Sequence, residues 1–236
     1  MKKNIAMRVA AFLFILTMIS TCAFATTFAK YTTSKSADDT ARVAKFGVVI
    51  NATGDDAMFK SVYDTTVNAN GTKVVAPGTK VDNAVTFTVT GTPEVSVKLT
   101  YTVTLTLEGW EIDYNNGITN VSDEEYCPLV FKVTIGTTTK SYKIGTGTGE
   151  YTNIAALKTA LESDINGLTN TYGPNHNLAE NNANDVKISW EWAFNDIDVA
   201  GAYQQNIKDT ALGDNAANGT PARVTLSLSC SVEQID

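Results

Sequence analysis

Side chains that commonly carry out catalysis are scarce in this sequence. Its one histidine, His176, lies in a polar stretch at 172–177, and no second histidine exists to complete a zinc site. The chain contains no H-E-x-x-H motif, no phosphate-binding glycine loop and no G-x-S-x-G nucleophile motif. We therefore predict no catalytic, metal-binding or cofactor-binding residues, and a protein that is not an enzyme.

Carboxylates are more frequent and form three short clusters, at 55–56, 123–125 and 196–198. Loop carboxylates of this kind can bind Ca²⁺, but none of the clusters has the spacing of an EF-hand. They are more typical of charged loops in contact with water. A glycosidase would need two carboxylates across a cleft, and the sequence alone does not pair any two of them.

Trp190 and Trp192 allow two interpretations. Exposed tryptophans on one strand could form a platform for a sugar ring. However, both share a strand face with Val186, Ile188 and Phe194, which favours packing in a core.

The cysteines also leave two alternatives. Cys22 lies in the apolar N-terminal segment, whereas Cys127 and Cys230 each fall in phase with the apolar face of a predicted strand. Two such cysteines could form a disulfide between strands or sheets outside the cell. Alternatively, they are two buried free thiols that pack as small hydrophobic side chains.

The elements that would position these residues are mainly β-strands. Threonine makes up about one residue in seven, and it favours the pleated surface of a sheet. Apolar and polar residues alternate over 95–107, and similar alternation occurs at 85–89, 186–194 and 224–232. The segment 43–50 is apolar on both faces and is expected to be covered on both sides.

One segment has a helical period instead. Ile154, Leu157, Leu161, Ile165 and Leu168 define an amphipathic helix within 151–168, with Thr152 as a possible N-cap and Gly167 at its end. We expect its apolar stripe to cover an open end of the sheets.

Segments rich in Asn, Gly and Asp, including 51–56, 115–120, 170–184 and 209–220, are predicted loops. Residues 30–236 are thus predicted to form a single antiparallel β-sandwich of about eight to ten strands with one inserted helix.

The N-terminus has the pattern of a secretory signal. Positive residues at 2, 3 and 8 precede an apolar stretch at 9–19, and small residues follow. Cleavage could follow Ala25 or Ala29. The alternatives are a retained anchor, because 9–25 is near the lower length limit of a spanning helix, and a lipoprotein modified at Cys22.

The net charge of −7 argues against binding to nucleic acid or to an anionic membrane surface.

Four short motifs lie at the two ends and in the middle of the chain. They are T-F-A-K-Y-T-T-S-K at 27–35 before the segment 41–49, V-A-P-G at 75–78, W-E-W-A-F at 190–194 followed by D-T-A-L-G at 209–213, and V-E-Q-I-D at 232–236. Together they resemble the TasA/camelysin family of exported proteins of Gram-positive bacteria. The resemblance implies a jelly-roll-like sandwich, a fibre subunit of the biofilm matrix or a cell-surface protein, and cleavage between Ala29 and Lys30 by a SipW-type signal peptidase. Some camelysin relatives are metalloendopeptidases, but this chain has no recognisable metal-binding motif.

Three functions follow as hypotheses. The first is a secreted structural protein of the extracellular matrix or cell surface that assembles with copies of itself into fibres and, after cleavage, has no membrane attachment. In it, residues 30–50 are donated to a neighbouring subunit, and the apolar residues of this assembly strand are Val43, Phe46, Val48 and Ile50. The second is an extracellular polysaccharide-binding module, and the third is a camelysin-like metalloendopeptidase.

Overall fold

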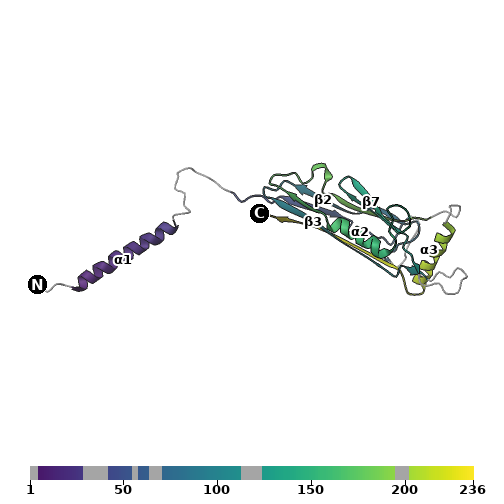
Figure 1. The fold of residues 1–236 in the computed structure, drawn as a ribbon, viewed down its shortest axis with the longest axis horizontal. Helices are drawn as coiled ribbons and strands as arrows, with labels where there is room; N and C mark the ends of the chain where they lie inside the picture. Colours follow the sequence, from purple (N-terminus) through teal and green to yellow (C-terminus); the bar gives the residue numbers. More distant parts are fainter. Residues whose placement is uncertain (1–4, 29–41, 55–57, 64–70, 113–123, 195–201) are drawn as a thin grey trace. The chain divides into compact units, whose positions relative to one another are not determined.

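Figure 1 shows the computed structural model of the chain, which describes residues 5–28, 42–54, 58–63, 71–112, 124–194 and 202–236. The chain divides into two units, Met1–Val43 and Ala44–Asp236. In the first unit, helix α1 (Ile5–Phe28) occupies most of the predicted signal segment. Among the described residues, no helix combines the length and the hydropathy needed to cross a membrane. Ala29 and Lys30, the predicted cleavage residues, lie outside the described residues.

The second unit is an antiparallel β-sandwich, which confirms the predicted fold class. One sheet has five strands in the order β1 (Val48–Thr53), β2 (Lys80–Gly91), β9 (Val186–Trp192), β6 (Leu129–Ile135) and β7 (Thr138–Tyr142). The other has three, in the order β10 (Arg223–Gln234), β3 (Val97–Glu108) and β8 (Thr169–Tyr172). A small ribbon of β4 (Glu111–Ile112) and β5 (Glu124–Glu125) completes the described strands.

Strict alternation predicted the central strands correctly. β9 buries every second residue, β3 does so from Val97 to Leu105, and the buried sides of the two sheets share one hydrophobic core. Trp190 and Trp192 are both buried, which confirms core packing for them. Phe194 is an exception to the expected pattern: β9 ends at Trp192, and Phe194 is 67% exposed.

Helix α2 (Ile154–Asn166) confirms the predicted amphipathic helix, with Leu157, Leu161 and Ile165 buried. Its N-cap is Asn153, whose side-chain oxygen accepts a hydrogen bond from the Ala156 N–H at 2.7 Å, and not the expected Thr152. The helix packs along β3 and also contacts β7 (Figure 1). It therefore covers an edge of the sandwich rather than an open end.

Two predicted loops contain regular structure. Helix α3 (Ala202–Ala217) extends into the predicted loop at 209–220, and it buries Asp209 and Leu212. The predicted loop at 170–184 holds most of β8 and a 3₁₀ turn, η2 (Glu180–Asn182). In both segments tertiary contacts override a local sequence that favours turns.

Candidate functional site

One lateral side of the sandwich is closed by α2 and its neighbours. β8 pairs with β3 only over Val97–Thr100. Beyond Thr100, side chains of α2 accept hydrogen bonds from the β3 backbone. The Val103 N–H donates to Asn166 Oδ1 at 2.6 Å, and the Leu105 N–H donates to Glu162 Oε1 at 2.9 Å. Side chains of a helix thus satisfy backbone donors that would otherwise form an unpaired strand edge.

The same helix is tied to β7, the edge strand of the other sheet. Asp164 accepts hydrogen bonds from Tyr142 Oη at 2.6 Å and from Lys140 Nζ at 2.5 Å. Both interactions favour the ionised carboxylate, so they lower the pKa of Asp164, with Lys140 the larger cause. We call the side formed by α2, β7 and β8 the closed side.

The opposite side, which we call the open side, carries β1 and β10. β1 is the end strand of its sheet, at the edge away from β7, and β10 flanks β3 on the edge away from β8 and α2. Since α2 contacts both β3 and β7, the remaining edges, β1 and β10, fall on the other side. Within the described residues, β1 pairs only with β2, and β10 pairs only with β3.

The inward face of β10 is only partly covered. Its apolar residues point toward the core, but only Leu226 is buried, at 8% exposure. Four others are half-buried: Val224, Leu228, Cys230 and Val232. A 12-residue edge strand with a partly uncovered apolar face is a suitable surface for an added strand.

The predicted assembly strand is placed differently from expectation. β1 begins at Val48 instead of Val43, and it runs to Thr53 into the predicted loop at 51–56. Most of its residues are exposed, so the expectation that both faces are covered is wrong. Val48 and Ile50 pair within the chain, opposite Gly91 and Val89 of β2. Val43, at the end of the first unit, is 91% exposed, and Phe46 is 41% exposed.

The start of β1 is clamped to the β2–β3 connection. The Lys45 N–H donates to Glu94 Oε2, and the Glu94 N–H donates to the Lys45 carbonyl, both at 2.8 Å. Next to this clamp, a Cβ on Gly91 (φ +124°) would lie 2.1 Å from the Gly47 carbonyl oxygen. The backbones approach so closely here that only glycine fits at position 91.

The possible disulfide between Cys127 and Cys230 does not fit the structure, in which both are free cysteines. Cys230 pairs with Tyr101 of β3, whereas Cys127 follows β5, which pairs with β4 beyond the far end of β3. Glu108 lies seven positions beyond Tyr101 on β3, and at about 3.3 Å per position this is about 23 Å. A disulfide requires Cα atoms within about 7 Å. The free-thiol alternative fits instead.

We expect the two thiols to differ sharply in reactivity. Cys127 is 4% exposed, and burial raises its pKa to about 12. Cys230 is half-buried; burial raises its pKa as well, and a hydrogen bond with Tyr101 opposes this shift. Because the thiolate is the reactive form, a water-soluble maleimide should label Cys230 in the folded chain and Cys127 only after denaturation. Mass spectrometry of the labelled peptides measures this; labelling of Cys127 in the folded chain would contradict the burial described here.

A buried polar cluster that the sequence did not reveal joins α3 to the sheets. Tyr126 Oη and Trp192 Nε1 both donate to Asp209 Oδ1, at 2.7 and 3.2 Å. Burial raises the pKa of Asp209, and the two hydrogen bonds oppose this shift. Beside it, Lys208 pairs with Glu124 at 2.6 Å. The cluster anchors a helix, and it gives no nucleophile or metal site.

The structure does not bring the remaining candidate residues together in one site, as far as they lie within the described residues. His176 is half-buried and stacks on Tyr172, with ring centroids 4.3 Å apart. Of the acidic clusters, 55–56, Asp123 and 196–198 lie outside the described residues, and Glu125 accepts a hydrogen bond from the Ile154 N–H. Among the described residues, no three His, Cys, Asp or Glu side chains are grouped to hold a metal ion. The three tryptophans are all buried, so they form no exposed platform for a sugar.

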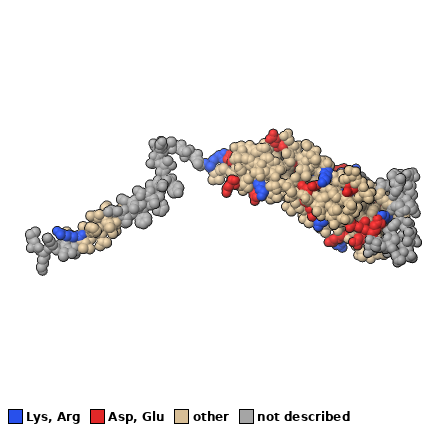
Figure 2. All heavy atoms as spheres, in the orientation of Figure 1, with Lys and Arg blue, Asp and Glu red and all other residues tan. Residues whose placement is uncertain are grey.

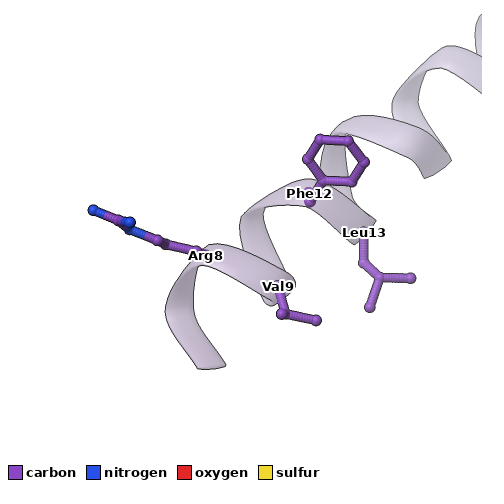
Figure 3. A pocket seen from close by; sticks show the side chains of 4 residues that line it. All are labelled: Arg8, Val9, Phe12 and Leu13. Atoms are coloured by element: carbon purple, nitrogen blue, oxygen red, sulfur yellow. The ribbon is translucent and has the colours of Figure 1, made fainter. Parts of the chain in front are cut away.

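Two surface hollows are lined by side chains that are not arranged for catalysis or metal binding. One lies along α1, where Arg8, Val9, Phe12 and Leu13 project from a single helix (Figure 3). The other lies near α2, with Val133 and Ile135 lining it together with the paired Lys140, Tyr142 and Asp164. In Figure 2, acidic side chains gather at the α3 end of the second unit.

No model of a known protein family matches the chain, and no curated protein is similar to it.

Proposed function

We propose that this chain is an exported structural protein that joins copies of itself by strand addition at the open side. The observation that carries the proposal is the asymmetry of the two lateral sides. The closed side satisfies its backbone donors through α2, and its edge strand β7 is polar. The open side presents β10 with an incompletely covered apolar face. The resemblance to the TasA/camelysin family agrees with this proposal.

The pairing of β1 narrows the segment that can be donated. The Lys45–Glu94 clamp and the register of β1 keep residues 45–53 in their own subunit. We therefore propose that residues 30–43 are donated, and that β1, with Val48 and Ile50, stays paired in its own subunit; residues 30–41 lie outside the described residues. Val43 is a described apolar side chain of the donated segment and is exposed for contact with a neighbour, whereas Phe46 lies beyond the clamp and stays with β1. Each subunit would give one strand and receive one, which propagates as a filament.

The proposal is tested by electron microscopy of purified protein that begins at Lys30. This protein is expected to form filaments, and a version that begins at Ala44, which keeps the Lys45–Glu94 clamp, is expected to stay monomeric. A peptide of residues 30–43, added to the truncated protein, should bind to it without producing filaments. Filaments of unchanged appearance from the truncated protein would refute strand donation.

Neighbouring residues of β10 offer a matched pair of variants. Leu228 is half-buried on the inward face, and Ser227 is exposed on the other. Leu228→Lys should abolish filaments because it places a charge in the proposed contact, whereas Ser227→Lys should leave them intact. Circular dichroism of both monomers checks that the fold is retained. Filaments from a folded Leu228→Lys variant would show that β10 is not the acceptor.

A further inference from the structure

Asparagine followed by glycine occurs four times in the chain, at 70–71, 116–117, 166–167 and 218–219. Glycine offers no side chain to hinder attack by its own backbone nitrogen on the preceding asparagine. The last two pairs lie within the described residues, and each follows or ends a helix. Their side chains have very different surroundings.

Both polar atoms of the Asn166 side-chain amide form hydrogen bonds. Its Oδ1 accepts from the Val103 N–H at 2.6 Å, and its Nδ2 donates to the Val103 carbonyl at 3.2 Å. The neighbouring Gly167 N–H donates to the Ser163 carbonyl at 3.0 Å. Rotation of the Asn166 amide toward Gly167 would break both of its hydrogen bonds to Val103 of β3.

Asn218 has no such restraint. It is exposed just after α3, and among the described residues its side chain makes no hydrogen bond. The Gly219 N–H makes one hydrogen bond, to the Ala216 carbonyl at 3.2 Å. Gly219 has a φ of +90°, a conformation that glycine adopts without strain.

We propose that Asn218 is a site of spontaneous deamidation in the folded protein and that the fold protects Asn166. The Gly219 nitrogen loses its proton and attacks the side-chain carbonyl carbon of Asn218, so that a new C–N bond closes a five-membered ring. The bond from that carbon to Nδ2 breaks, and ammonia leaves with the proton. Water then opens the ring to give aspartate or isoaspartate, with no oxidation or reduction.

The product changes the charge at the end of α3. A carboxylate replaces a neutral amide near the C-terminus of the helix, where the helix dipole disfavours negative charge. Asp214, whose carbonyl accepts a hydrogen bond from the Asn218 N–H, adds a second negative charge nearby. Modification should therefore loosen the last turn of α3.

The test is incubation of the full folded chain at mildly alkaline pH, followed by peptide mass spectrometry. Deamidation is expected to be at least about tenfold faster at Asn218 than at Asn166, which corresponds to about 1.4 kcal/mol. In a urea-denatured sample the two rates should become similar, because both sites are then free. Asn218→Gln should remove the acidic species that forms at this position and leave the slow reaction at Asn166 unchanged.

Two results would overturn the proposal. Equal rates at Asn166 and Asn218 in the folded chain would show that the contacts with Val103 give no protection. An Asn218 that stays intact in the folded chain but reacts in urea would show that the turn after α3 is protected as well.

Discussion

Replacing Trp190 with alanine is expected to lower the free energy of unfolding by about 3–5 kcal/mol. The ring is 1% exposed and packs against Phe59 and Tyr63, with centroids 5.3 and 5.9 Å away. Its Nε1 donates to the Met58 carbonyl at 2.7 Å. One side chain of β9 thus holds the segment 58–63 on the sheet, and its loss removes both packing and a hydrogen bond.

Denaturant unfolding followed by circular dichroism measures the effect. Trp190→Phe is the matched control, because it keeps an aromatic ring and loses the N–H; we expect a smaller loss, dominated by a hydrogen bond worth about 1 kcal/mol and some packing. A loss below about 1 kcal/mol for Trp190→Ala would mean that the segment 58–63 contributes little to the core.

Asp209→Ala is expected to cost about 2–3 kcal/mol, because it leaves two buried donors, Tyr126 Oη and Trp192 Nε1, without their acceptor. Asp209→Asn should cost less, since its side-chain oxygen can still accept. Thermal unfolding at neutral pH compares the three proteins. Equal stability of the alanine variant and the parent would show that α3 is not anchored through this carboxylate.

The pH dependence of the free energy of unfolding, compared between the parent protein and Asp209→Asn, tests the burial of Asp209. Burial raises its folded pKa above the ordinary value of 3.8, so the folded state binds the proton more readily than the unfolded state. The stabilising effect of this proton is fully present below 3.8 and is lost as the pH rises through the folded pKa. Relative to Asp209→Asn, the parent should therefore become more stable as the pH falls toward 3.8. The opposite trend would contradict the burial.

Long, regular patterns predicted the core elements, and the short alternation at 85–89 found part of β2, whereas segments of mixed pattern were predicted poorly. β3, β9 and α2 each repeat their period over many residues, and all three are present as expected. α3 was missed because its large aliphatic residues are only Ile207 and Leu212 and it has several of the residue types typical of turns; Leu212 is its one buried apolar residue among those described. The N-terminal boundary of β1 was placed five residues too early, because apolar character alone does not show where pairing starts.

The open side could not be derived from the sequence. It depends on which strands are neighbours, and β10 pairs with a strand far away along the chain. The Asp209 cluster was equally hidden, because a single carboxylate in a polar helix carries no pattern. Both features come from long-range contacts between segments that look ordinary on their own.

The pairing of β10 with β3 also bears on when the chain can fold. Gln234 is opposite Val97, and Arg223 is opposite Glu108. The central strand of the smaller sheet therefore has no partner on this edge until the residues between Glu108 and Arg223 have been made. Contacts between such distant segments slow folding, and a nascent chain is made from its N-terminus. While it lacks β10, the chain leaves one edge of β3 without a partner. The smaller sheet therefore cannot close until β10 has been made, and its folding lags well behind the synthesis of β3.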